Sequence, residues 1–155
     1  MIDSSDFLYF MLDKGFTFST GVPCSYFKDL LIALEKETEI IYLPATREDE
    51  AMGIAAGYFL GGGKTFLIMQ NSGLANIGDA FTSLTQLYNI PLLLFVSYRG
   101  LESDKDFPEH IIMGDVMKPV LEAYQIPYWT IEEENWKIVL DNALEVMEET
   151  SKPVC

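Results

Sequence analysis

The sequence predicts an α/β fold in which a mainly parallel sheet carries helices on both faces, forming three layers. Segments with the short, β-branched or aromatic pattern of strands alternate along the chain with helical patterns of about ten residues or more. Parallel strands need a crossover connection, and the connecting helix packs on the sheet. The 155 residues match the usual size of one domain, about 100 to 200 residues, so we expect a single domain over 1–155.

The first helix and the first strand are marked by residue spacing and by stop signals. Apolar residues fall at helical spacing over 7–12, after a start signal at Ser4 and Asp6, and Gly15 supplies a stop. Residues 16–20 are β-branched and aromatic, which predicts a strand. The alternation then continues as helix 26–34, strand 39–43, helix 51–60, strand 65–69, helix 74–87, a most apolar strand 91–96, polar loop 97–108, helix 109–124, strand 128–131 and acidic helix 132–150.

One glycine run looks like a nucleotide-binding motif, but its context excludes this interpretation. The letters GGGKT at 61–65 lack the first glycine of a P-loop, because position 58 is Tyr58. The run also leads from a helix into a strand, which is the reverse of a P-loop. It is better explained as a helix stop and tight turn. The dinucleotide pattern GxGxxG is absent after the first strand, where GVP stands at 21–23.

The charge balance is strongly acidic. Ten Lys and Arg against 24 Asp and Glu give a net charge of −14, a field that repels phosphate backbones and anionic lipid. The longest apolar runs, such as 90–96, are far shorter than the roughly 20 residues that span a bilayer. Asp3 and Asp6 stand where a signal peptide would have its basic region, and Cys24 and Cys155 do not make a disulfide framework. We therefore expect a cytoplasmic protein that binds neither nucleic acid nor membrane.

Polar side chains that could bind a ligand or take part in catalysis follow the predicted strands, and ligands bind at this position in sheets of this kind. Both arginines and the single histidine are predicted at this edge, and planar arginine forks suit an anionic ligand. Polar residues belong in loops in any protein, so the interpretation as plain loops stays open. No spacing of His, Cys or carboxylates predicts a metal site on this chain. The residues after successive strands are Cys24 and Ser25; Thr46, Arg47, Glu48, Asp49 and Glu50; Gln70, Asn71, Ser72 and Gly73; and Tyr98, Arg99 and His110.

Five short segments resemble one enzyme family. They are GVPCS at 21–25, REDEAMGIAAG at 47–57, MQNSGLAN at 69–76, RG at 99–100 and HIIMG at 110–114. In this order, and with compatible spacing from about the first helix to the last, they resemble the pyrimidine-binding domain of sulfopyruvate and phosphonopyruvate decarboxylases, which are thiamine diphosphate enzymes. GVPCS and QNSGL are specific when they occur together. The resemblance implies that 1–155 is one pyrimidine-binding domain.

The resemblance also implies a division of labour between two chains. The family's second domain holds the diphosphate and its Mg²⁺ through a GDG motif followed by Asn, and that motif is absent here. We therefore expect this domain on a partner beta subunit, in a minimal assembly of two alpha and two beta chains. Separate chains are typical of sulfopyruvate decarboxylase alpha subunits, whereas phosphonopyruvate decarboxylases more often carry both domains in one chain.

The implied reaction is the conversion of 3-sulfopyruvate to sulfoacetaldehyde and carbon dioxide with thiamine diphosphate, a step similar to one in coenzyme M biosynthesis. Phosphonopyruvate or another 2-oxo acid is an alternative substrate. A noncatalytic ligand-binding or regulatory subunit is an alternative of a different class. The acidic net charge argues mildly against a strongly anionic substrate, so local arginine and partner lysine must overcome it.

The family's site residues carry over to matching positions. Glu48 matches the glutamate that hydrogen-bonds the pyrimidine ring nitrogen, and His110 matches a histidine that serves as proton donor or anion contact; both are expected to be catalytic. Arg47 replaces the Asn of many thiamine enzymes and either pairs with the carboxylates beside it or reaches the sulfonate. The expected cofactor-binding residues are Glu48, Pro23, Gln70, Asn71, Ser72 and Gly73, and the expected substrate-binding residues are Arg47, Arg99, Asn71 and His110.

Two further expectations concern apolar packing. Cys24 is expected to be a buried thiol that acts as a small hydrophobe. Apolar residues on the helix faces are candidates for a subunit interface, although core packing explains them equally well. They are Ile54, Tyr58, Ile77, Phe81 and Leu84.

Overall fold

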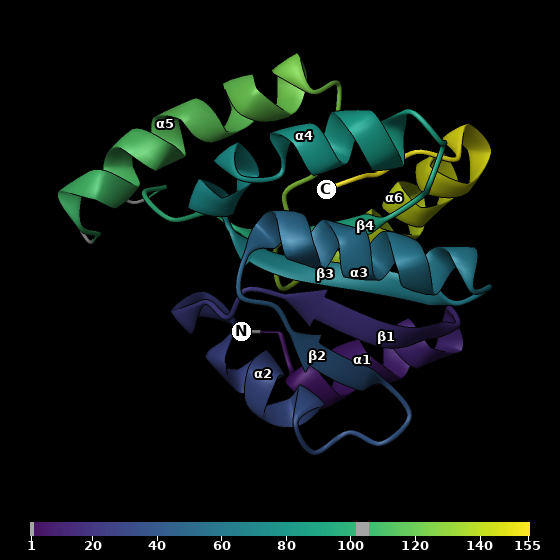
Figure 1. Cartoon of the computed structure of the whole chain (residues 1–155). Coiled ribbons are helices and arrows are strands. Elements are labelled where there is room, and N and C mark those ends of the chain that lie inside the picture. The colour runs from purple at the N-terminus through teal and green to yellow at the C-terminus, as the bar shows by residue number, and fades with distance from the viewer. Residues whose placement is uncertain (1, 102–105) are drawn as a thin grey trace.

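The computed structural model describes residues 2–101 and 106–155 and confirms the predicted α/β fold, with helices on both faces of a parallel sheet (Figure 1). The described residues form a sheet of four strands in the order β2-β1-β3-β4, and every neighbouring pair is parallel. The strands are β1 (Phe16–Gly21), β2 (Ile41–Pro44), β3 (Lys64–Gln70) and β4 (Leu93–Ser97). Because the chain passes from β1 out to β2 and then back across to β3, the strand order reverses between β1 and β3. Such a reversal marks the usual ligand crevice of an open α/β sheet.

Two apolar layers flank the sheet. Alternate residues of β3 point to opposite faces: Phe66 and Ile68 join one layer, and Leu67 and Met69 join the other. The first layer is covered by α1 (Ser4–Asp13), α2 (Lys28–Leu34) and α6 (Trp136–Thr150), and the second by α3 (Glu48–Leu60), α4 (Gly78–Ala80) and α5 (Pro108–Ala123). Of the candidate interface residues, Ile77 and Phe81 are fully buried in the second layer, so for these two the alternative of core packing applies.

The first helix begins where the sequence predicts. Asp3 is its N-cap, and the carboxylate accepts hydrogen bonds from the backbone N–H groups of Ser5 and Asp6, both at 2.9 Å. Phe7 of this helix then packs edge-on against Phe66 and Phe95 of the sheet. These contacts fix the first layer on the sheet, at the face opposite to α3.

The predicted helix over 74–87 is in fact broken into three pieces. A 3₁₀ turn η2 (Asn71–Ala75) leads into the short α4, and a π-helical turn η3 (Phe81–Gln86) follows. The hydroxyls of Thr82 and Thr85 donate to backbone carbonyls four residues back, at 2.9 and 3.0 Å. Such bonds disturb regular helix geometry, and π turns are frequent at functional sites. The helix predicted over 26–34 likewise begins with a 3₁₀ turn, η1 (Ser25–Phe27), before α2.

The strand predicted over 128–131 is wrong. The N–H of Trp129 donates to Cys155 O, and the N–H of Cys155 donates to Pro127 O, both at 2.9 Å. Pairing through the single residue Cys155 does not form a ladder. The neighbouring Val154 forms an isolated parallel bridge to β4, so the edge of the sheet beyond β4 is covered by residues 154 and 155. Among the described residues, no helix has the length and apolar character needed to cross a membrane.

Candidate active site

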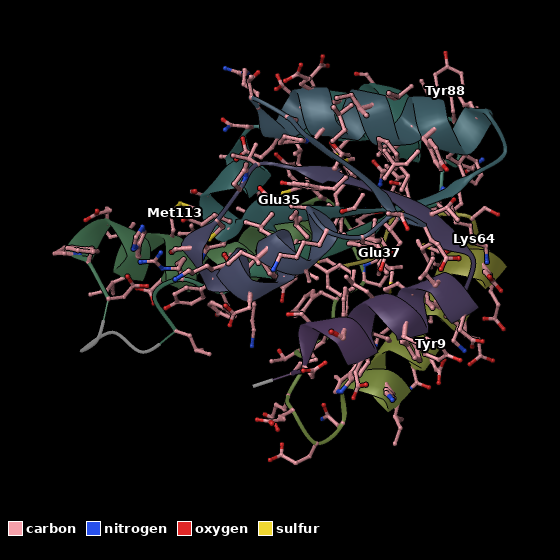
Figure 2. All side chains as sticks on the ribbon, turned by 90° about the horizontal axis from the view of Figure 1, so that it is seen from below. Tyr9, Glu35, Glu37, Lys64, Tyr88 and Met113 are labelled. Atoms are coloured by element: carbon pink, nitrogen blue, oxygen red, sulfur yellow. The ribbon has the colours of Figure 1, made fainter. Side chains whose placement is uncertain are left out.

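The carboxyl ends of the strands bring the predicted site residues to one edge of the sheet. In Figure 1 the arrowhead of β1 points to the left of the view, where α3 and α5 begin. Figure 2, turned by 90°, places Met113 of α5 at one end of the molecule and Lys64, the first residue of β3, at the other. The residues that follow β1, β2, β3 and β4 therefore lie at the same edge as the start of α5.

Glu48 is the buried carboxylate of this edge. It is the first residue of α3, which begins at Glu48 rather than at the predicted 51, and it is 8% exposed. Asp49 and Glu50 complete an acidic first turn, which the helix dipole favours and which is the sequence signal for the earlier start. Nδ2 of Asn76 donates to Oε2 of Glu48 at 2.7 Å. No described residue donates to Oε1, so this buried carboxylate keeps one oxygen for a ligand.

The loop after β3 wraps closely around Glu48. A Cβ at Gly73 would lie 2.5 to 2.7 Å from Cγ, Cδ and Oε1 of Glu48, so a glycine is required for the carboxylate to occupy its place. Asn71 is fully buried, and its Nδ2 donates to the backbone carbonyl of Arg99 at 2.8 Å. Its Oδ1 is buried and has no hydrogen-bond partner among the described residues. A buried acceptor without a donor is costly, which makes it a candidate ligand contact.

Three strand ends are joined by a small polar cluster around Cys24. The Cys24 thiol is buried and lies 3.2 Å from Oγ of Ser97 and 3.7 Å from Oε1 of Gln70. Nε2 of Gln70 also donates to Oγ of Ser72 at 2.9 Å. The predicted burial of the thiol is confirmed, and the cluster ties the loops after β1, β3 and β4 together.

Arg99, Asp106 and His110 form a second group, which we call the Arg99 cluster. Nε and Nη2 of Arg99 donate to the Asp106 carboxylate at 2.7 and 2.5 Å, and Nδ1 of His110 lies 2.7 Å from Oδ1 of Asp106. Their side chains are only 11%, 5% and 16% exposed. The hydrogen bonds from Arg99, and then from His110, hold the pKa of Asp106 well below its ordinary value. Two nitrogens of the Arg99 guanidinium are therefore already bound by Asp106 of the same chain. The third, Nη1, lies 3.3 Å from Oγ of Ser25.

Arg47 lies at the surface of the same edge. Its side chain is 65% exposed, and its Nε and Nη2 donate to the Asp49 carboxylate at 3.0 and 3.1 Å. This pairing lowers the pKa of Asp49. Of the two alternatives for Arg47, the structure has the pairing with a neighbouring carboxylate. Pro23, in the loop after β1, is also exposed.

Two residues of this edge escaped the sequence analysis. Asn76 stood in the motif at 69–76 without a role, and 28 residues separate it from Glu48, so no local pattern links the two. Asp106 stood in the loop 97–108, although its spacing of four residues from His110 at a helix start was a usable signal. A shallow hollow beside Glu48 is lined by Thr46, Arg47, Asp49, Glu50, Asn76, Asp79 and Ala80.

The described residues offer no group of three or more His, Cys, Asp or Glu side chains arranged to hold a metal ion. The chemistry of the edge is that of a buried carboxylate with an open oxygen, a buried amide acceptor and an arginine–carboxylate–histidine cluster. These groups suit hydrogen bonding to a heterocycle and contact with a small anion.

No family model matches the chain, but individual curated proteins do. The chain is 41% identical over 133 residues to sulfopyruvate decarboxylase subunit alpha of Methanococcus maripaludis, covering 84% of this chain and 79% of that protein. It is 40% identical over 129 residues to the subunit of the same name of Methanocaldococcus jannaschii, covering 82% and 76%. Phosphonopyruvate decarboxylase of Streptomyces hygroscopicus is 41% identical over 116 residues, which are 75% of this chain but 29% of that enzyme.

The fold has a counterpart among solved structures. The X-ray structure of a protein from Mycobacterium smegmatis, assigned as a thiamin diphosphate-dependent enzyme, superposes with a TM-score of 0.73 at 18% sequence identity. The match covers 99% of this chain and 30% of the other. At this identity the likeness concerns the fold.

Proposed function

The chain belongs to the family of sulfopyruvate decarboxylase alpha subunits, and from this premise we propose that it is the pyrimidine-binding chain of a thiamine diphosphate-dependent decarboxylase. The proposed reaction converts 3-sulfopyruvate to sulfoacetaldehyde and carbon dioxide. A beta subunit carries the diphosphate-binding domain and holds Mg²⁺, in a minimal assembly of two alpha and two beta chains. In this proposal neither chain is active alone.

The observation that carries the proposal is the state of Glu48. Its carboxylate is nearly buried at the start of α3, one oxygen is bound by Asn76, and the other is open. The position lies beside the reversal of strand order between β1 and β3, where an open α/β sheet binds its ligand. A carboxylate placed only for the helix dipole gains about 0.3 to 1 kcal/mol and has no need of burial.

The residues present fit the aminopyrimidine end of the cofactor. Oε1 of Glu48 is free to share a proton with a ring nitrogen, and Oδ1 of Asn71 is a buried acceptor that lacks a donor. When bound, thiamine diphosphate supplies the electron sink on which a 2-oxo acid loses carbon dioxide. Pro23, Gln70, Ser72 and Gly73 would complete the cofactor contacts from the loops after β1 and β3.

Glu48 is proposed to hold a proton at the ring nitrogen of the cofactor. Burial keeps water away from the shared proton, and the Asn76 amide fixes the carboxylate in one orientation. Proton transfer by a positioned side chain of this kind contributes about a hundred- to ten-thousand-fold in rate. His110 is proposed as a proton donor or anion contact on the substrate side.

The acidic group of the substrate is proposed to meet Arg99, Arg47, Asn71 and His110. The Arg99 fork is held by Asp106, so Arg99 offers the substrate its Nη1 edge rather than a free fork. A tetrahedral sulfonate and a tetrahedral phosphonate both suit such a contact. The 41% identity to a phosphonopyruvate decarboxylase favours phosphonopyruvate as the second candidate substrate.

The test is the release of carbon dioxide by the chain co-expressed with a candidate beta chain encoded beside it. Sulfopyruvate, phosphonopyruvate and pyruvate are compared, each with and without thiamine diphosphate. We expect release only from the mixture, fastest with sulfopyruvate, and loss of about a hundredfold or more in Glu48→Gln. Glu50→Gln, in the same helical turn, is the matched control and should keep near-normal rates. A folded complex that releases no carbon dioxide from any of the three acids would favour a noncatalytic subunit.

A further inference from the structure

We propose that Asn76 is a positioning residue that orients the Glu48 carboxylate toward the cofactor, an inference that rests on the proposed function. Nδ2 of Asn76 donates to Oε2 of Glu48 at 2.7 Å, and no other described residue donates to that carboxylate. A carboxylate only accepts hydrogen bonds, so the amide nitrogen must face it. Asn76 thereby decides which oxygen of Glu48 is left open.

One short turn holds Glu48 from two sides. The 3₁₀ turn η2 places Gly73 against Cγ, Cδ and Oε1 of the Glu48 side chain, at a distance that leaves no room for a Cβ. The backbone N–H of Asn76 donates to Gly73 O at 2.9 Å, which fixes Asn76 relative to that contact. Steric contact on one side and a charge-assisted hydrogen bond on the other leave the carboxylate a single orientation.

The chemistry of the contact requires a neutral donor. Aspartate at position 76 would have nearly the same shape, but it would set a second carboxylate beside Glu48, and like charges at this distance repel. Alanine would remove the donor without adding charge. Asn76 is an exposed residue in the hollow beside Glu48, so both substitutions leave the apolar layers untouched.

The experiment measures binding of two ligands to the complex with the beta subunit by calorimetric titration. One ligand is thiamine diphosphate, and the other is its analogue with a CH group in place of the pyrimidine ring nitrogen that Glu48 is proposed to contact. The variants are Asn76→Ala, Asn76→Asp, Glu48→Ala and the double variant Glu48→Ala with Asn76→Ala. Asn142→Ala on the distant α6 is the matched control for loss of an exposed amide.

We expect Asn76→Ala to weaken thiamine diphosphate binding about tenfold, the usual effect of one hydrogen bond to a charged group, and Asn76→Asp to weaken it further. Binding of the analogue should be unchanged in Asn76→Ala. In the Glu48→Ala background, Asn76→Ala should add nothing. In steady-state assays kcat should fall while KM for the 2-oxo acid stays the same.

Three results would overturn the inference while the proposed function stands: unchanged thiamine diphosphate binding in Asn76→Ala, equal weakening of both ligands, or an undiminished effect of Asn76→Ala in the Glu48→Ala background. Each presupposes that the unmodified complex binds thiamine diphosphate and that Glu48→Ala weakens this binding. A folded unmodified complex that binds no thiamine diphosphate overturns the proposed function and this inference together.

Discussion

Glu48 and Asp106 are both nearly buried carboxylates at the same edge of the sheet, but their surroundings differ. Asp106 is bound by Arg99 and His110 and by the backbone N–H groups of Gly100 and Phe107. Glu48 receives one hydrogen bond, from Asn76. The Asp106 carboxylate is saturated by its own chain, whereas the Glu48 carboxylate is left incomplete.

The difference separates a structural role from a ligand-binding role. A saturated ion pair holds a loop against a helix and fixes the groups around it, and it has little left to offer a ligand. Oε1 of Glu48 has no partner among the described residues, so it remains available to share a hydrogen bond with a ligand. We therefore propose that the cofactor binds on the side of Glu48, and that the Arg99 cluster mainly supports His110 and the Nη1 edge of Arg99.

The largest expected effect comes from adding one methyl group at Gly73. In Gly73→Ala the new Cβ overlaps the Glu48 carboxyl group, which is the movable end of a flexible side chain. The carboxylate should swing aside, so that the fold survives but activity falls by about a hundredfold or more, as for loss of the acid itself. The unfolding free energy should drop by no more than about 2 kcal/mol, the value of the lost hydrogen bond. Carbon dioxide release and urea unfolding measure the two effects.

Gly57→Ala is the control for this prediction. Gly57 lies within α3, and a Cβ there would meet nothing within 4 Å in the described chain. Replacement of a helical glycine by alanine should stabilise the isolated chain by about 0.5 to 1 kcal/mol. A Gly73→Ala variant with normal activity would contradict the assigned tight contact between Gly73 and Glu48.

An intermediate effect is expected when the saturated carboxylate is neutralised. Because Arg99 and His110 lower the folded-state pKa of Asp106, its charge stabilises the fold above the unfolded-state value of about 4. That contribution is lost as the pH falls through the lowered pKa. Asp106→Asn should therefore be less stable than the unmodified chain in urea at pH 7, and the difference should shrink between about pH 4 and pH 3. A difference that is constant over this range would show that the ion pair does not stabilise the fold.

The smallest effect on stability is expected at the exposed arginine. Arg47 and Asp49 form a surface pair, and such pairs contribute little, so Arg47→Ala should change the melting temperature by no more than about 2 °C. Its proposed contact with the substrate predicts a KM for sulfopyruvate that rises a few-fold, with the difference fading at high salt as charges are screened. An unchanged KM would contradict the proposed contact between Arg47 and the substrate.

Alternation of strand and helix patterns predicted the layers of the fold, because burial on two faces imposes a residue pattern that is visible in sequence. The helix over 74–87 was predicted as continuous because the bonds of the Thr82 and Thr85 hydroxyls to backbone carbonyls, which accompany its break, leave no periodic signature in the sequence. The strand over 128–131 had the right composition, but only Cys155 pairs with that segment. Strand identity depends on the neighbour as much as on the segment itself.

The same distinction holds at the candidate site. Glu48, Gly73 and His110 stood in short motifs, and the resemblance gave each of them a role, whereas Asn76 stood in such a motif without one. Asn76 and Asp106 act through contacts made in three dimensions, and the distribution of hydrogen bonds between Glu48 and Asp106 depends on how loops from different strands meet. The sequence therefore predicts the edge, whereas the contrast between its two carboxylates depends on the three-dimensional structure.

The most direct test of the assignment to Glu48 is a crystal structure of the complex with the beta subunit and thiamine diphosphate. We predict that a pyrimidine ring nitrogen lies within hydrogen-bonding distance of Oε1 of Glu48, about 2.6 to 3.2 Å, with the Asn76 amide still on Oε2. The Asp106 carboxylate should remain on Arg99. A cofactor ring bound elsewhere, with Oε1 of Glu48 facing solvent or another protein group, would contradict the account.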